Sequence, residues 1–81
     1  MVQVSFNATF RPALGGADAL EIDAATLREL MRTLVAKYPR LQGHIDSGLV
    51  LALNGEIYRD NWDVEIPEGS EVHLMPRIQG G

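Results

Sequence analysis

Residues 49–58 read LVLALNGEIY, and this stretch is the clearest structural signal in the chain. The five apolar residues at 49–53 predict a buried strand. Asn54 and Gly55 follow, and this dipeptide is the strongest short signal for a tight hairpin turn, because both central positions of that turn need a positive φ. Residues 57–58 then begin the returning strand. An antiparallel hairpin is therefore expected in the second half of the chain.

The N-terminal region predicts two further strands. Residues 2–10 alternate strictly between apolar and polar side chains, as a strand does when one of its faces is buried. Pro12 and the two glycines at 15–16 then supply turn chemistry. A shorter alternation at residues 20–24 predicts the second strand.

The C-terminal region predicts a last strand and a tail. Residues 67–69 read Pro-Glu-Gly, which indicates a turn, and residues 70–75 form the predicted strand. Pro76 is expected to end it, because proline donates no hydrogen bond to a sheet. We therefore divide the chain into a folded domain at residues 1–76 and a flexible tail at residues 77–81, which ends in two glycines.

One amphipathic helix is predicted between the two halves. Thr26 and Glu29 have the T-x-x-E spacing of a capping box, which marks a helix start. Pro39 disfavours helical geometry at Tyr38, so the helix should end there, and residues 40–48 are expected to form a loop. The apolar stripe at helical spacing consists of Leu27, Leu30, Met31, Leu34, Val35 and Tyr38.

This order of elements predicts the α+β class, with four to five strands packed on one main helix. The helix must bury its stripe against one face of the sheet, which gives two layers. No second helix is predicted, so the other face of the sheet should be uncovered. It would serve as plain surface or as a docking face, and the alternation places on it Gln3, Ser5, Asn7, Thr9, Val50, Ala52, His73 and Met75.

Composition excludes several classes of function. An 81-residue chain has a small core, which disfavours a self-sufficient enzyme with a deep pocket. The formal net charge is -4 and the basic residues are scattered along the sequence, so nucleic acid is not expected as a partner. Cysteine is absent, which excludes disulfides and thiol nucleophiles and fits a cytoplasmic protein. We expect no signal peptide and no membrane-spanning segment.

The isolated polar and aromatic residues favour ordinary structural roles. His44 and His73 are far apart in sequence and are expected to be surface residues, so no metal site is predicted. Trp62 is expected to pack on the core. Asp60 and Asp63 lie in a turn, where carboxylates are usually solvated.

Taken together, these segments resemble the MoaD/ThiS family of ubiquitin-like sulfur carriers. Residues 50–56, 67–72 and 74–81 carry the resemblance, which extends over nearly the whole chain. Phe10-Arg11-Pro12, followed by the glycines at 15–16, is most similar to the branch that includes the carrier for cysteine synthesis. The resemblance implies a ubiquitin-like β-grasp fold, in which a mixed sheet packs on one main helix.

The resemblance also implies a carrier and not an enzyme. An ATP-dependent adenylating enzyme would join AMP to the carboxylate of Gly81, and a sulfur donor would then displace AMP to leave a thiocarboxylate. An acceptor enzyme for molybdopterin, thiazole, cysteine or a related metabolite would receive the sulfur. The partner would use the ATP, and the chain itself would bind no cofactor. Gly80 and Gly81 suit this chemistry, because a residue without a Cβ allows close backbone approach in a narrow cleft.

The side chains beside the terminus are candidate contacts for such partners. Delivery of the tail requires the body of the carrier to be held next to the enzyme. The candidates are Met75, Arg77, Ile78 and Gln79, and Arg77 would suit an acidic groove.

Two alternatives to the sulfur carrier stay open at this point. A ubiquitin-like modifier would be joined through Gly81 to lysine side chains of other proteins, and it needs the same activation step. A non-catalytic β-grasp interaction module would do no chemistry at its terminus. We expect the native chain to end at Gly81, which argues against this module.

Overall fold

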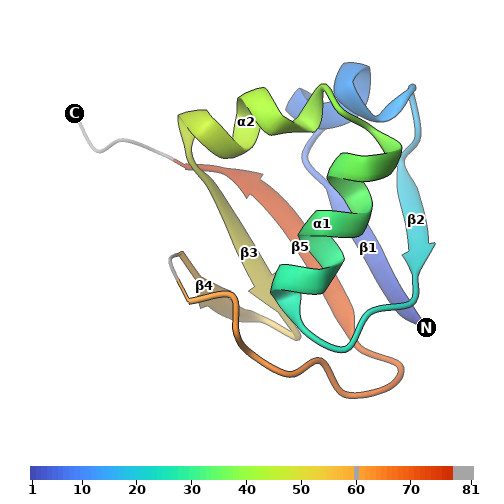
Figure 1. Ribbon diagram of the computed structural model, residues 1–81, viewed down its shortest axis with the longest axis vertical. Helices are drawn as coiled ribbons and strands as arrows, with labels where there is room; N and C mark the ends of the chain where they lie inside the picture. The colour runs from blue at the N-terminus through green and yellow to red at the C-terminus, as the bar shows by residue number, and fades with distance from the viewer. Residues whose placement is uncertain (60, 78–81) are drawn as a thin grey trace.

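The computed structural model describes residues 1–59 and 61–77, which form a sheet with helices packed on one face (Figure 1). The main helix is α1 (Leu27–Lys37), and the shorter helical segments are α2 (Leu41–Ser47) and the 3-10 helix η1 (Ala8–Leu14). The strands are β1 (Val2–Phe6), β2 (Ala19–Ile22), β3 (Leu49–Leu53), β4 (Glu56–Tyr58) and β5 (Glu71–Pro76). The predicted α+β class is confirmed.

The sheet is mixed, and the last strand lies in its middle. Its strand order is β2-β1-β5-β3-β4. β5 pairs in parallel with β1 and antiparallel with β3, while both outer pairs are antiparallel. Because β5 is central, the chain reaches its C-terminal tail directly from the most enclosed part of the sheet.

The core lies between the sheet and α1. The predicted stripe is confirmed, with four of its residues buried and Val35 and Tyr38 half-buried at its margin. Tyr38 follows the last residue of α1, as the proline at position 39 predicts. The fully buried large side chains are Phe10, Leu14, Leu27, Leu30, Leu34, Leu41, Leu51, Leu74, Val4 and Val72.

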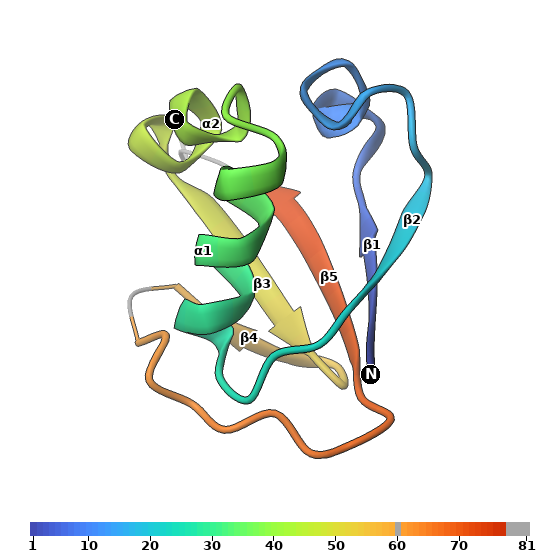
Figure 2. The ribbon, with the colours of Figure 1, turned by 45° about the vertical axis from the view of Figure 1, so that its right-hand side comes forward.

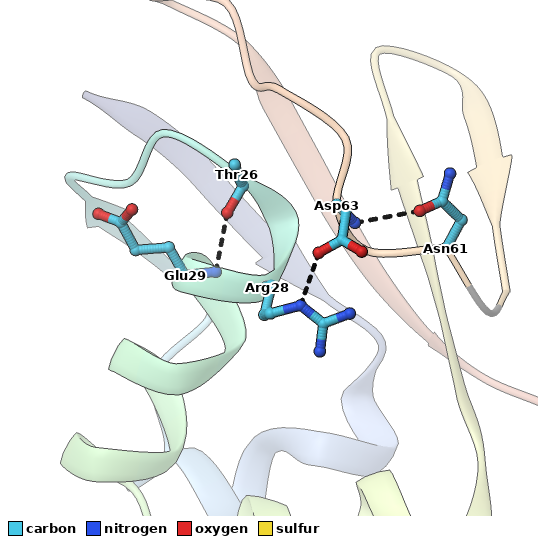
Figure 3. Close-up of polar contacts among 5 residues, drawn as sticks. All are labelled: Thr26, Arg28, Glu29, Asn61 and Asp63. Carbon is cyan, nitrogen blue, oxygen red and sulfur yellow. Dashed lines mark hydrogen bonds and ion pairs between the residues drawn. The ribbon is translucent and has the colours of Figure 1, made fainter.

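Thr26 and the segment that follows β4 accept hydrogen bonds from the free amides in the first turn of α1. The Glu29 amide donates to Thr26 Oγ1 over 3.1 Å, so the predicted cap is present. The amides of Leu27 and Arg28 donate to the carbonyl oxygens of Val64 and Trp62. Figure 3 shows the Glu29 carboxylate directed away from Thr26, so the reciprocal half of the box is not formed.

The prediction of a single strand at residues 2–10 is wrong beyond Phe6. Asn7 accepts a hydrogen bond from the Thr9 amide through Oδ1 (2.9 Å) and starts η1. Ala8 and Thr9 are exposed, whereas Phe10 is 1% exposed in the core. Phe10 and the buried residues at 13–14 have helical spacing. The sequence nevertheless alternates up to residue 10, because the residue at position 8 is also apolar.

The prediction of a loop at residues 40–48 is also wrong, because this stretch contains α2. Leu41 is fully buried and Ile45, one helical turn later, is partly buried against the same core. The helix has only seven residues, contains Gly43 and has no side-chain cap, so it lacks the usual sequence signals. Gly48 ends it with a φ of 99°.

The hairpin is confirmed, and the last strand runs one residue further than predicted. Asn54 and Gly55 have φ values of 48° and 89° between β3 and β4. Pro76 lies within β5, opposite Leu49. The β1–β5 ladder ends at the Phe6–Leu74 pair, so the missing N–H of Pro76 interrupts no pairing with β1.

The second face of the sheet carries no helix in the described part of the chain. Both α1 and α2 lie on the same side of the sheet (Figures 1 and 2). The open face is mixed, as predicted, although Thr9 lies in η1 and does not belong to it. Exposed or half-buried on this face are Gln3, Ser5, Glu71, His73, Ala52, Met75 and Ile57.

Candidate functional site

The point where the tail leaves the domain is held by the start of β3. The Arg77 amide donates to the Gly48 carbonyl oxygen over 3.2 Å, which continues the β3–β5 pairing by one residue. Gly48 has a φ of 99°, and a Cβ placed there would lie 3.0 Å from Cδ of Arg77. Both features require glycine at position 48. The tail therefore starts from a defined place.

An apolar groove lies beside this exit on the open face of the sheet. Its volume is about 320 Å³, and Asn7, Val50, Ile57, Arg59, Met75, Pro76 and Arg77 line it. Val50 and Met75 are direct neighbours across β3 and β5, and Ile57 is 52% exposed. Met75 is half-buried and Val50 is buried, so Ile57 is the apolar side chain that the groove offers most openly to a partner.

The structure brings two of the predicted contact residues together and adds two more. Met75 and Arg77 both line the groove. Ile57 and Arg59 were not singled out in the sequence, although they follow the hairpin turn with the two-residue spacing of one strand face. The other four predicted site residues, Ile78, Gln79, Gly80 and Gly81, lie outside the described residues.

Two arginines give this end of the groove a positive charge. Arg59 and Arg77 are both exposed and come from different segments, one after β4 and one after β5. Neither forms an ion pair with another described residue. A partner that contacts the groove would thus meet apolar surface flanked by guanidinium groups, which suit carboxylates.

The histidines have structural partners. The His44 ring packs edge-on against Phe10, with ring centroids 4.8 Å apart. His73 Nδ1 lies 2.8 Å from the Ser5 hydroxyl oxygen on the open face. Within residues 1–59 and 61–77, no group of three or more histidine, cysteine, aspartate or glutamate side chains could hold a metal ion.

Asp63 is exposed, as predicted, and it also forms an ion pair with α1. Arg28 Nε donates to Asp63 Oδ1 over 2.7 Å, and the Asp63 amide donates to Oδ1 of Asn61 (Figure 3). The hydrogen bond from Arg28 holds the pKa of the Asp63 carboxyl below its usual value. Trp62 lies between these residues and is partly buried against the core, as predicted. Asp60 lies outside the described residues.

None of the helices described is long and apolar enough to span a membrane. The longest, α1, has eleven residues.

The relatives of this chain are identified by its match to a protein-family model. The model of the ThiS family matches residues 4–81, which is nearly the whole chain. The chain belongs to the ThiS family. Members of this family are small carrier proteins and not catalysts. No curated protein matches this ThiS-family chain significantly in sequence.

Solved structures show the same fold at low sequence identity. A chain of the BexX/CysO complex of Amycolatopsis orientalis has a TM-score of 0.82 and 19% identity, with 100% of both chains covered. Molybdopterin converting factor subunit 1, as the Pyrococcus furiosus protein is described, has a TM-score of 0.80 and 26% identity over 95% of this chain and 97% of its own. Small archaeal modifier protein 1 of Methanosarcina acetivorans has a TM-score of 0.79 and 22% identity over 99% of this chain and 95% of its own.

These findings confirm the predicted family and the predicted β-grasp fold. A CysO complex is among the structures that share this fold. The ThiS-family chain thus has a ubiquitin-like β-grasp body in which the end of β5 lies beside an apolar groove.

Proposed function

We propose that this chain is a sulfur carrier whose active group is the carboxylate of Gly81. In the cytoplasm, an adenylating enzyme would activate this carboxylate with ATP, a sulfur donor would convert it to a thiocarboxylate, and a biosynthetic acceptor enzyme would take the sulfur. The observation that carries the proposal is the course of β5. This strand runs through the middle of a ThiS-family domain, and Arg77, which precedes Gly80 by three positions in the sequence, is hydrogen-bonded to Gly48.

The chemistry needs two steps at one carbon atom. A carboxylate oxygen of Gly81 would attack the α-phosphorus of ATP and release pyrophosphate, which leaves an acyl adenylate. A sulfur nucleophile would then attack the acyl carbon, and AMP would leave with the electron pair of the broken C–O bond. The chain needs no cysteine for this sequence because the sulfur is carried on the terminal carbon, and the chain has none.

The hydrogen bond between Arg77 and Gly48 supports a model in which the chain supplies the acyl group and the partner supplies catalysis. The body would be recognised through its surface, while the residues after Arg77 would reach the nucleotide in the partner. Glycine at both terminal positions removes side chains that would obstruct a narrow cleft. The chain then contributes position and an acyl group, and the partner contributes catalysis.

The direct test is the intact mass of the protein after incubation with an adenylating enzyme from the same genome, ATP and sulfide. We expect the mass to rise by the difference between one sulfur and one oxygen atom. Deletion of Gly81 should abolish the change and leave the melting temperature unaltered, because an exposed terminus contributes little packing. Full conversion of the deletion variant would refute a role for Gly81.

The groove on the open face is the proposed contact surface for these enzymes. Ile57→Asp places a charge in the groove at a side chain that is already 52% exposed, so folding should be retained. Ala19→Asp is a matched control, since Ala19 is exposed on β2 at the other edge of the same face. We expect only Ile57→Asp to raise the KM of the adenylating enzyme for the carrier. Equal effects of both variants would place the contact elsewhere.

A second candidate function is protein modification through an isopeptide bond. Its specific support is the fold similarity to small archaeal modifier protein 1. Conjugates of higher mass, formed in cell extract with ATP and lost on deletion of Gly81, would favour this function. A thiocarboxylate without such conjugates would favour the carrier.

A further inference from the structure

Four of the seven basic residues line two hollows beside α1 and α2, and two of these residues, Arg59 and Arg77, also line the apolar groove on the open face. One hollow of about 380 Å³ lies between α1 and α2, and a second of about 250 Å³ lies between α2 and the tail exit. Both are lined by Arg28, Ile45 and Trp62, so the two hollows adjoin each other. We call the pair of hollows the basic groove, and its arginines are Arg28, Arg32, Arg59 and Arg77.

The basic groove differs in charge from the rest of the molecule. The chain as a whole has a formal net charge of -4, yet no described aspartate or glutamate lines the groove. Of the four arginines, only Arg28 forms an ion pair with a described residue, namely Asp63. Four basic residues that are scattered in the sequence are therefore neighbours in space.

The floor of the groove is apolar, and its one aromatic residue is Trp62. Val35, Ile45 and Trp62 supply its apolar surface. The indole Nε1 of Trp62 is buried and has no acceptor among the described residues. Because this atom is buried, a ligand in the groove would contact the indole ring and not the donor itself.

The position of Trp62 is set by α1. The Arg28 amide donates to the Trp62 carbonyl oxygen over 2.8 Å, and the Arg28 side chain holds the next residue, Asp63 (Figure 3). The backbone on both sides of the Trp62 ring is thereby held in place, which lowers the entropy that binding would cost.

We propose that the basic groove binds an acidic peptide segment of a protein partner. Carboxylates of the segment would pair with the arginines, and one apolar side chain would pack on Val35, Ile45 and the Trp62 ring. Because the groove reaches Arg77, the bound segment would lie next to the tail exit. The inference goes beyond the proposed function, since it depends on the groove and not on chemistry at Gly81.

A short acidic peptide fits these features better than nucleic acid does. Four arginines suffice for a few carboxylates, whereas the remainder of the surface, with its excess of acidic residues, would repel a phosphate backbone. The apolar floor would be left unused by a phosphate chain and filled by a leucine-sized side chain.

The single tryptophan makes the proposal testable by NMR. The probe is a pool of short blocked peptides, each with leucines flanked by glutamate and aspartate, added to the full-length ¹⁵N-labelled chain up to about 1 mM. We expect the Trp62 indole N–H resonance to shift in a saturable way. Peptides with glutamine and asparagine in place of the acids should shift it far less, and added salt should weaken binding because the charges are exposed.

Charge reversal in the groove separates specific binding from general attraction. Arg32→Glu and Arg59→Glu should each weaken binding about threefold to fivefold, as expected for one exposed ion pair. Arg40→Glu changes the net charge equally and is the matched control, since Arg40 is exposed and lines neither hollow of the groove. It should have little effect. Amide spectra of all variants verify that they are folded.

Several results would overturn the proposal. One is an unmoved Trp62 resonance with every acidic pool, and another is equal weakening by Arg40→Glu. A shift caused by a single-stranded oligonucleotide but not by peptides would make the groove a phosphate site. A shift that depends on protein concentration without any peptide would make it an interface between two copies of this chain.

Discussion

Two residues with positive φ determine how the hairpin and the tail exit are built. Asn54 is held at φ 48° in the β3–β4 turn, and its side chain also accepts the Glu71 amide (2.9 Å) and donates to Ser70 Oγ (3.1 Å). Gly48 combines a φ of 99° with close approach to Arg77. Asn54 connects the last residue of β3 to residues 70–71, and Gly48 connects the first residue of β3 to Arg77. Substitution of either residue therefore affects more than a turn.

Gly48→Ala should destabilise the protein and disturb the tail exit. An alanine at this φ costs about 1–2 kcal/mol, and its Cβ would press on the Arg77 side chain, which lies 3.0 Å away. Urea denaturation measures the loss, and the Arg77 amide resonance reports the disturbance.

Gly43→Ala is the matched control for Gly48→Ala. Gly43 lies inside α2, and a Cβ added there would have no neighbouring atom within 4 Å, so alanine should stabilise by up to about 1 kcal/mol. Equal effects of the two substitutions would contradict the role assigned to Gly48.

Substitutions at Asn54 should separate two contributions to stability, that of the positive φ in the turn and that of the side-chain hydrogen bonds. Asn54→Gly keeps the positive φ but loses both side-chain hydrogen bonds, which amounts to about 1–2 kcal/mol. Asn54→Ala loses these bonds and adds a left-handed strain of about 1–2 kcal/mol. Denaturation should therefore rank wild type above glycine and glycine above alanine. Alanine as stable as glycine would show that the φ value is not a constraint.

At the scale of elements, the segment after β4 completes α1. Its carbonyl oxygens accept the first two amides of the helix, and its Asp63 pairs with Arg28. The helix start, Trp62 and the floor of the basic groove thus form one connected unit. A change at Asp63 should be felt at Trp62 even though Asp63 is exposed.

The Arg28–Asp63 pair should make stability depend on pH in acid. The pKa of Asp63 lies below its ordinary value of 3.8, because Arg28 donates to the carboxylate. The stability it contributes is therefore fully present above pH 3.8 and is lost as the pH falls through the lower pKa of the folded state. Asp63→Asn should lack this part of the acid dependence, with Trp62 fluorescence as the probe.

Arg28→Gln provides the reciprocal test of that pair. It removes the cause of the pKa shift, so it should lose the same acid dependence, and the double variant should lose no more. A wild-type acid dependence that survives in both single variants would assign it to other groups.

At the scale of the whole molecule, one core joins all the elements. The first and last strands are neighbours in the middle of the sheet, and α1, α2 and η1 all bury side chains in the same cluster. No part of the chain has a separate core of its own within the described residues. Unfolding should therefore be cooperative, with the helix and the sheet melting together.

Leu34→Ala should remove a large share of the total stability. Leu34 is 0% exposed, and truncating such a side chain costs about 2–5 kcal/mol, compared with about 5–15 kcal/mol for a whole domain. Val35→Ala, its half-buried neighbour at the edge of the core, should cost clearly less. Urea denaturation measures both, and equal losses would contradict the core described here.

At the scale of the whole molecule, several acidic and basic side chains lie at opposite ends of the sheet. Glu21, Glu56 and Glu71 lie at the end of the sheet far from the tail exit, as the registers of β1, β3 and β5 place them. Arg59 and Arg77 lie at the exit itself. This polarity would orient a partner with acidic residues toward the tail end.

The sequence by itself determined the features that depend on neighbouring residues. The hairpin at Asn54-Gly55, the cap at Thr26, the apolar stripe of α1 and the terminal glycines are all short-range patterns. Each follows from local sterics or from the spacing of side chains, so each could be recognised without the structure. Together with the family resemblance they were enough to predict the β-grasp fold.

Only the tertiary structure decided the features that depend on distant segments. η1 and α2 are short and owe their stability to Phe10, Leu14 and Leu41 in the core, which local propensity does not report. The basic groove joins α1, the segment after β4 and the exit of β5, and so brings together arginines that are up to 49 positions apart, from 28 to 77. Their grouping arises because packing, and not sequence order, sets which side chains are neighbours.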